Sequence, residues 1–453
     1  MTSAFEIRFA WTDGAGMRDA ALAETSARVE VWAGGACVTR AWHRRLRSVV
    51  EGVEISLLPV AEWVADSLPT LCFEGPRADH VRSLRGARSA AERAWHRRHG
   101  WLAWRAGFAL PELLVSRAGE GFVRVDWLRG PSGFDAMPVQ FLEEGSAVAP
   151  RDVVIEELSK IVDGVLARCQ GIESAELSAL RERWALRADA TSGERRLLER
   201  AGRLGLDAYD AGDVDDALAA LLEADVAIAE PVLDDLLDLA DPACIEPQIP
   251  RIAALLEEAR GAVATPAVTE RLRRARHEFP SLPPGAAPHE HGYACASRLR
   301  EASLGVAPGV LGSALDDAIA DRLLPAANLR ETSTDFLVGG LQGLATTGTH
   351  GAPFVVARPR AAAGRRFDRA RALYSLLAAS TPRLITSASE PHQQASRAFA
   401  AELLAPAAFL RARITSPLVE REDVDALARE LVVDPRVVEH QIDNHALAEI
   451  AAG

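Results

Sequence analysis

The chain has 453 residues, of which 48% are hydrophobic and 25% are charged, a composition typical of a globular protein with more than one domain. Its formal net charge of −13 opposes binding of the whole molecule to nucleic acid or anionic membranes, so such binding needs a local basic patch. The five cysteines are scattered and include no C-x-x-C pair, which argues against a disulfide framework or a zinc ribbon and indicates a reducing compartment.

The N-terminal region predicts a cytoplasmic protein that does not enter a membrane. Residues 1–14 lack the charged and then apolar layout of a signal peptide. The most apolar stretch, 55–73, is interrupted by Glu62, Asp66 and two prolines, so it does not predict a membrane span.

Residues 1–148 form the first predicted domain, which has a mixed α+β composition. Eight of the nine tryptophans lie here, and this sets the segment apart from the rest of the chain. Alternating patterns predict one β-hairpin over 27–42, with its turn at Gly34–Gly35, and a second hairpin over 113–128. Between them, residues 89–107 predict a helix.

The tetrapeptide Trp-His-Arg-Arg occurs at residues 42–45 and again at 95–98, where arginines and tryptophans alternate along the predicted helix. Guanidinium groups beside indoles suit phosphates and stacked bases, which makes this a possible nucleic-acid or anion patch. The alternative is an amphipathic helix with buried tryptophans and outward arginines, and this is the preferred interpretation. The residues concerned are Arg93, Trp95, Arg97, Arg98, Trp101, Trp104 and Arg105.

Residues 149–278 predict an all-helical middle segment, either a bundle or a small solenoid. Over 151–169 the apolar residues recur at the spacing of one helix face. Two acidic groups, Asp213–Asp216 and the set Asp234, Asp235 and Asp238, predict a solvated face, with a basic partner as the alternative. A proline-rich linker, 279–291, follows.

The third segment, 292–453, contains five motifs in series. They are a helix over 292–306, strands around glycine turns over 338–359, helices over 365–377 and 395–406, and a helix-turn-helix-like pair over 420–445. This series resembles the ImmA/IrrE family of zinc metallopeptidase-like domains. The resemblance implies a zincin-like domain in which helices surround a small sheet.

In that family the helix corresponding to 365–377 carries H-E-x-x-H, because histidines at i and i+4 share a helix face and grip one zinc ion. Here the histidine positions hold Arg371 and Ser375, the glutamate position holds Ala372, and the third ligand falls near Gln393. The resemblance therefore predicts a pseudo-enzyme without cofactor or metal.

A binding cleft is predicted at Arg371, Tyr374, Ser375 and Glu402. A buried guanidinium needs compensation, so Arg371 is expected to reach solvent or to pair with Glu390 or Glu402. The weaker alternative is a rebuilt zinc site from His350, His392 and Glu390.

The resulting hypothesis is a non-catalytic regulator or sensor that binds a protein partner, by analogy with family roles in stress, toxin–antitoxin or phage-defence regulation. One alternative is a zinc metalloendopeptidase with displaced ligands. The other is a nucleic-acid-binding regulator that uses the Trp/Arg helix or the terminal helix pair, whose second helix would present Arg436, Gln441 and Asn444. The sequence does not specify an oligomeric state.

Overall fold

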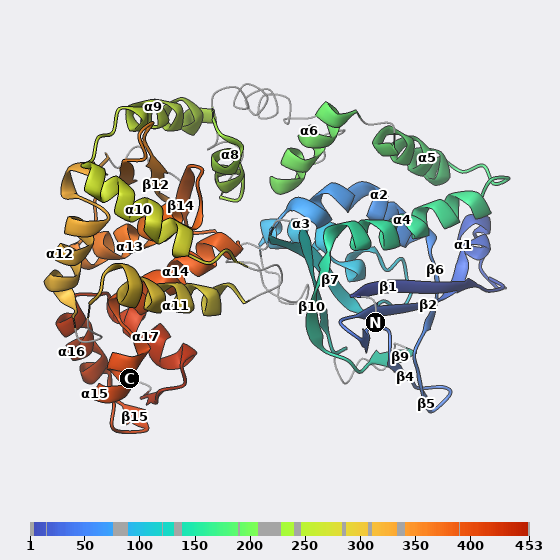
Figure 1. Cartoon of the computed structure of the whole chain (residues 1–453). Coiled ribbons are helices and arrows are strands. Elements are labelled where there is room, and N and C mark those ends of the chain that lie inside the picture. The colour runs from blue at the N-terminus through green and yellow to red at the C-terminus, as the bar shows by residue number, and fades with distance from the viewer. Residues whose placement is uncertain are drawn as a thin grey trace. The chain divides into compact units, whose positions relative to one another are not determined.

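The computed structural model describes residues 4–14, 16–75, 89–119, 121–130, 138–188, 191–206, 228–239, 246–282, 287–306, 310–332, 340–388 and 390–451. The chain forms two compact units, Met1–Leu218 and Ala219–Gly453, each with its own helices and sheets (Figure 1). This mixture confirms the predicted α+β multidomain class. Among the described helices, none is long and apolar enough to cross a membrane.

The described strands of the N-terminal unit form three antiparallel sheets. In the first, β2 pairs with β1, β3 and β6. The second has the order β10–β8–β7, and the third has the order β5–β4–β9. Its elements are β1 (Phe5–Trp11), α1 (Ala20–Glu24), β2 (Ser26–Ala33), β3 (Ala36–Cys37), β4 (Ala41–His43), β5 (Ser48–Val50), β6 (Val53–Ser56), α2 (Leu58–Phe73), α3 (Ala90–His99), the 3-10 turn η2 (Trp101–Trp104), β7 (Glu112–Gly119), β8 (Phe122–Leu128), β9 (Val139–Phe141), β10 (Gly145–Pro150), α4 (Arg151–Arg168), α5 (Ala175–Ala188) and α6 (Ser192–Arg203).

Both predicted hairpins are present. Gly34 and Gly35 connect β2 to β3 with φ angles of 56° and 86°, the left-handed backbone that a two-residue hairpin turn requires. The pair β7–β8 forms the second hairpin. The predicted helix 89–107 is shorter than expected, because α3 ends at His99 and only one 3-10 turn follows.

Helix α4 belongs to the N-terminal unit, although the sequence placed it in a separate helical segment. Its predicted apolar stripe is fully buried and shares one core with β1, β2 and α2. The helix approaches β1 so closely that a Cβ on Gly164 would lie 3.2 Å from the ring of Phe9. The predicted boundary at residue 148 is therefore wrong, because the first middle helix completes the core of the sheets before it.

The C-terminal unit is built on one four-stranded sheet of order β11–β13–β12–β14, in which only β11 and β13 run parallel. Its elements are α8 (Glu230–Leu237), the 3-10 turn η4 (Glu246–Gln248), α9 (Ile249–Arg260), α10 (Pro266–Glu278), α11 (Pro288–Arg298), the π-helical turn η5 (Leu299–Ser303), α12 (Gly312–Arg322), the 3-10 turn η6 (Ala326–Asn328), β11 (Leu329–Glu331), β12 (Leu341–Thr347), β13 (Pro353–Ala357), α13 (Ala362–Ala378), β14 (Arg383–Thr386), α14 (Pro391–Leu404), α15 (Ala407–Arg413), β15 (Leu418–Val419), α16 (Arg421–Leu431), α17 (Pro435–Asn444) and β16 (Glu449–Ile450).

Helices α11, α13 and α14 form the centre of this unit. The first and third pack so closely that a Cβ on Gly292 would lie 2.4 Å from the carbonyl oxygen of Ala395. The predicted terminal helix pair is present as α16 and α17. Arg366 of α13 donates to the carbonyls of Leu431 (2.6 Å) and Val432 (2.5 Å) and so caps the end of α16.

The predicted boundary at 278 and the linker 279–291 also differ from the structure. The ring of Phe279 packs 5.6 Å from that of Tyr374, and residues from Pro288 onward form α11. Leu272 of α10 lies in the same core as α13. The proline-rich segment therefore joins parts of one unit. The first two residues of the predicted strand segment 338–359, and the whole acidic run Asp213–Asp216, fall outside the described residues.

Candidate functional site

Helix α13 carries Arg371, Ala372 and Ser375, the residues that the sequence resemblance predicted to replace a metal-binding motif. Its buried side chains pack with the sheet and α14, so apolar contacts hold the helix in place. Arg371 and Tyr374 are each 1% exposed, Ser375 is 3% exposed and Ala372 is fully buried. The predicted binding cleft is closed at these residues, because side chains inside a core offer no surface to a partner.

Neutral oxygens hold the Arg371 guanidinium. Its Nε donates to Ser396 Oγ (3.1 Å), and its Nη2 donates to the carbonyl of Thr386 (2.7 Å). Nη1 donates to Gln342 Oε1, and Nη2 also donates to Gln393 Oε1 at 2.7 Å. The side chain thereby joins α13 to β12, β14 and α14, so one residue connects the sheet with the two central helices.

The expected exit of Arg371 to solvent and its expected pairing with Glu390 are both wrong. Glu390 lies 3.7 Å from Arg383 instead. Burial, together with the nearby Arg397 guanidinium, lowers the pKa of Arg371 to about 9, and the field of Asp368 opposes this shift. Arg371 therefore remains a cation at neutral pH, and the dipoles of its hydrogen-bond acceptors provide the direct contacts to its charge.

Gln393 substitutes for a strand at the outer edge of β14. Its Nε2 donates to the carbonyl of Leu384 (2.8 Å), and its Oε1 accepts from the N–H of Thr386 (3.0 Å). One residue of a neighbouring parallel strand would bond the same two groups on either side of Ile385. The side-chain amide thus satisfies an edge that no backbone covers there, and Arg371 fixes the orientation of the amide.

Ser375 and His392 form a second contact between α13 and α14. Ser375 Oγ lies 3.1 Å from His392 Nε2, and the rings of Tyr374 and His392 lie 5.2 Å apart. Burial lowers the pKa of His392 well below its usual value, and the charges of Arg383 and Arg371 lower it further. The imidazole is therefore neutral at pH 7. The serine hydroxyl lies inside the core, so the pair does not form an accessible nucleophile and base.

The residues proposed for a rebuilt zinc site do not converge. His350 is exposed in the turn between β12 and β13, whereas His392 and Glu390 lie at the start of α14. Within the described residues, no group of three or more His, Cys, Asp or Glu side chains could hold a metal ion. A zinc ion does not fit beside Arg371 either, because the guanidinium cation and its donor N–H groups fill that space.

Glu402, the other carboxylate expected beside Arg371, joins α14 to the terminal helix pair. Its Oε2 accepts from the N–H of Ala407 (3.1 Å) and from Gln441 Nε2 (2.8 Å), and it lies 3.7 Å from His445. Burial raises the pKa of Glu402, and the hydrogen bonds from Ala407 and Gln441 oppose this shift. Its role is to anchor α17, and it is not part of a binding cleft.

Of the three predicted base-reading residues on α17, one is buried and two are exposed. Gln441 is fully buried, and Asn444 Nδ2 donates to the hydroxyl of Tyr293 (3.0 Å). Arg436 is exposed. Because Gln441 lies inside the protein, one of the three predicted residues is not available to read bases.

The Trp/Arg helix has part of the arrangement that the preferred interpretation predicts, with Trp104 and Arg98 as the two exceptions. Trp95 and Trp101 are 4% and 1% exposed, and Trp104 is partly exposed. Trp104 lies 5.7 Å from the guanidinium of Arg97, and its Nε1 donates to the carbonyl of that residue. The exposed arginines of this segment are Arg93, Arg97 and Arg105. With two of its three indoles inside the core, this helix lacks the exposed rings that stacking on bases needs.

Arg98 is the exception among these arginines, because it takes part in a buried ion network. It donates twice to Glu74, at 2.8 and 2.7 Å. The Glu74 carboxylate also lies 2.9 Å from Nε2 of His99. The second ring nitrogen of His99, Nδ1, lies 2.6 Å from the carbonyl oxygen of Val115. Burial alone would raise the pKa of Glu74, but the hydrogen bonds and charges of His99 and Arg98 outweigh it and lower the pKa to about 2.

This network predicts acid lability of the N-terminal unit. A carboxylate whose folded-state pKa is depressed stabilises the fold above its unfolded pKa, near 4.5, and loses that contribution as pH falls toward about 2. The shift corresponds to about 3 kcal/mol. In denaturant titrations, we expect Glu74→Gln to have a lower free energy of unfolding than the unchanged chain at pH 7. This difference should disappear as the pH falls from 4.5 to 2. Glu54→Gln, at an exposed position, should be as stable as the unchanged chain at every pH. A stability difference for Glu74→Gln that does not depend on pH would contradict the role given to the Glu74 carboxylate.

Asp235 of α8, which the sequence placed on a solvated face, is buried against β14. Its carboxylate accepts from Arg383 at 2.9 and 2.7 Å and from the N–H of Leu384 at 2.9 Å. The side chains of Asp235 and Arg383 are 1% and 19% exposed. No sequence signal separated Asp235 from its acidic neighbours, because its partner lies 148 residues further along the chain.

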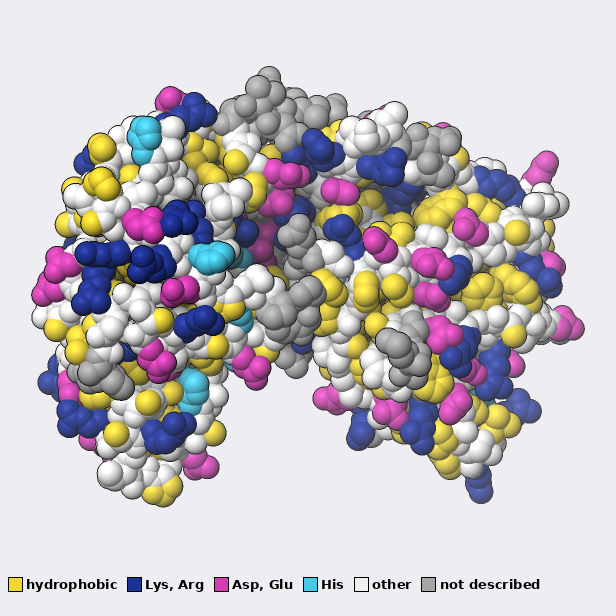
Figure 2. All heavy atoms as spheres, in the orientation of Figure 1, with side chains coloured by type: hydrophobic (Ala, Val, Ile, Leu, Met, Phe, Trp, Pro, Cys, Tyr) yellow, Lys and Arg dark blue, Asp and Glu magenta, His cyan; other side chains and the backbone are white. Residues whose placement is uncertain are grey.

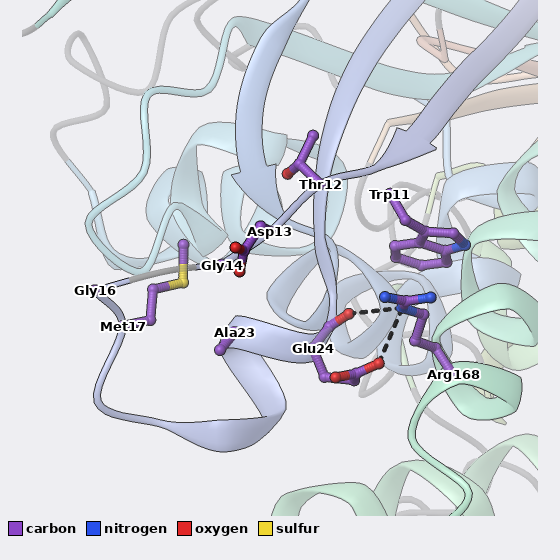
Figure 3. Close-up of a pocket in the computed structure, with 9 residues that line it drawn as sticks. All are labelled: Trp11, Thr12, Asp13, Gly14, Gly16, Met17, Ala23, Glu24 and Arg168. Atoms are coloured by element: carbon purple, nitrogen blue, oxygen red, sulfur yellow. Dashed lines mark hydrogen bonds and ion pairs between the residues drawn. The ribbon is translucent and has the colours of Figure 1, made fainter.

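A surface pocket of about 640 Å³ lies in the N-terminal unit, away from these positions. Figure 3 shows Arg168 over the ring of Trp11, at 5.4 Å, with its Nε bonded to the backbone carbonyl and side chain of Glu24. The residues around the pocket are Trp11, Thr12, Asp13, Gly14, Gly16, Met17, Ala23, Glu24 and Arg168. Its only arginine already has a carboxylate partner, so the pocket presents no free cation to a ligand.

The chain was compared with protein-family models, with curated proteins and with solved structures, and no match was found in any of the three.

Proposed function

We propose that the C-terminal unit is a non-catalytic, peptidase-like domain in which Arg371 and its hydrogen bonds occupy the position of a metal centre. One observation carries the proposal. Arg371 and Gln393, which the ImmA/IrrE resemblance places at the first and third ligand positions, bond directly at 2.7 Å. Ser375, at the second position, bonds to the residue beside Gln393. Three positions that would have to surround one metal ion are thus neighbours across α13 and α14.

The replacement chemistry opposes hydrolysis. A metallopeptidase needs neutral imidazoles or carboxylates to hold its ion and a carboxylate to take a proton from bound water. This chain has a buried cation, an alanine, a serine and an amide at those positions. We infer a regulator that binds a protein partner through its surface, since the core around Arg371 is closed. The partner class is proposed by analogy with the family.

Restoring the ligands tests the assignment. The triple variant R371H/S375H/Q393E is expected to bind one zinc ion per chain, because two imidazoles from α13 and a carboxylate from α14 would then face one point. Metal content after gel filtration and the visible spectrum of the cobalt form measure this. The double variant R371H/S375H lacks the carboxylate and should bind zinc more weakly.

Measurements on the unchanged chain distinguish this proposal from the alternative of a metalloendopeptidase with displaced ligands. The unchanged chain, purified without chelator, should carry no stoichiometric zinc and should cleave no protein substrate in an EDTA-sensitive reaction. Bound zinc in the unchanged chain would overturn the proposal. A folded triple variant with no more affinity for zinc than the unchanged chain would show that the three positions are not ligand positions.

A further inference from the structure

The first Trp-His-Arg-Arg copy lies in a different environment from the second. Trp42 stands on β4, directly opposite Val49 of β5 and Gln140 of β9. On this face of the small sheet Trp42 is 38% exposed and Val49 is 46% exposed. The opposite face is buried through Ala41 and its neighbours. The sheet therefore keeps an indole ring at the surface, where the second copy buries its own.

The turn between β4 and β5 adds an apolar tip between two cations. Leu46 is 62% exposed, and both Arg45 and Arg47 are exposed. The turn is held by the N–H of Leu46, which donates to His43 Nδ1 (3.1 Å). Arg47 has a φ of 50°, a left-handed conformation that costs an arginine more than it costs glycine or asparagine.

The two turn arginines are uncompensated. Within the described part of the chain, neither guanidinium forms a hydrogen bond or an ion pair, whereas nearby Arg40 lies 3.2 Å from Glu143. Figure 2 shows hydrophobic and basic side chains side by side at the end of the N-terminal unit where Figure 1 labels β4 and β5. The hairpin is thus a small cationic and aromatic surface on a chain whose net charge is −13.

This chemistry selects among possible partners. Three partly exposed apolar side chains fall well short of the roughly 800 Å² that each partner buries in a stable protein interface. A partly exposed indole near two unpaired guanidinium groups matches the two features that single-stranded nucleic acid offers, namely stacked bases and a phosphate backbone. A duplex hides its base faces, so it would use the arginines alone.

We propose that the β4–β5 hairpin binds single-stranded nucleic acid, with a base stacked on Trp42 and adjacent phosphates paired with Arg45 and Arg47. Val49, which stands opposite Trp42, and Leu46 in the turn then contact the sugar or base beside it. This site is independent of the proposed pseudo-peptidase core, because it lies in the other unit.

Fluorescence polarisation of labelled dT10 and rU10 with the full-length protein tests the proposal. Two phosphate contacts predict that the logarithm of the binding constant falls with the logarithm of salt concentration with a slope of about −1.4. Trp42→Leu keeps an apolar side chain but loses the stacking face, and we expect about tenfold weaker binding. Trp42→Tyr should retain most of the affinity.

The charge variant R45Q/R47Q should weaken binding about tenfold and bring the salt slope close to zero. Its control, R18Q/R195Q, removes two exposed arginines elsewhere in the unit and should leave affinity and slope unchanged. Circular dichroism establishes that each variant is folded. Absence of oligonucleotide binding, or binding that Trp42→Leu and R45Q/R47Q leave unchanged, would overturn the proposal. So would hairpin-dependent binding to phosphatidylserine vesicles without binding to oligonucleotides, which would assign the surface to a membrane.

Discussion

Replacing Arg371 by alanine is expected to destabilise the C-terminal unit by about 3 to 5 kcal/mol, the cost of breaking a buried polar network and leaving a cavity. Four acceptors, on Gln342, Thr386, Gln393 and Ser396, lose their donor together. Those on Thr386 and Gln393 are buried, so water cannot readily replace the guanidinium. Arg371→Lys keeps the charge, but a single ammonium lacks the planar fork that reaches all four, so we expect it to be destabilised as well.

Urea titration of the full chain measures this effect, and hydrogen exchange of α13, α14 and β14 locates it. The matched control is Arg369→Ala, on the exposed face of the same helix, which should change stability by less than about 0.5 kcal/mol. An Arg371→Ala protein as stable as this control would show that the hydrogen bonds are not a structural centre. The assignment of α13 as the degenerate motif helix would then lose its main support.

Asp235→Ala is the second substitution for which we expect a large effect, about 3 to 5 kcal/mol in the same unit. It leaves the Arg383 guanidinium largely buried without its bidentate partner and removes the acceptor of the Leu384 N–H. The loss should release α8 from β14, because this carboxylate is the polar contact between the two elements. Hydrogen exchange should therefore accelerate first in α8 and at the edge strand.

A double variant separates the charge effect from the loss of packing. Asp235→Ala combined with Arg383→Met removes both charges of the bidentate pair, so it should be more stable than Asp235→Ala alone. Glu230→Ala, at the exposed start of α8, serves as the control and should have little effect. If Asp235→Ala behaves like the control, the buried pair does not hold α8 in place.

Local sequence patterns were sufficient to predict several individual elements. The apolar stripe of α4, the Gly34–Gly35 turn and the helices of the terminal pair all appear where their spacing predicted them. The reason is that helix and strand periodicity records which side of an element is buried, and turn chemistry depends on adjacent residues. Neither signal needs knowledge of what covers the buried side.

What covers each element was decided by tertiary structure. The stripe of α4 predicted a helical bundle, but the sheets of the N-terminal unit bury it. The same tetrapeptide puts Trp42 at a surface and Trp95 in a core, because Trp42 lies on the exposed face of a small sheet, whereas Trp95 lies on a helix that packs against α2 and β7. The partners of the buried charges likewise could not be predicted from the sequence. Arg371 bonds to neutral oxygens 15 to 29 positions away, and Asp235 bonds to an arginine 148 positions away. Residue type alone sets the cost of burying a charge, whereas only the folded chain determines which groups offset that cost.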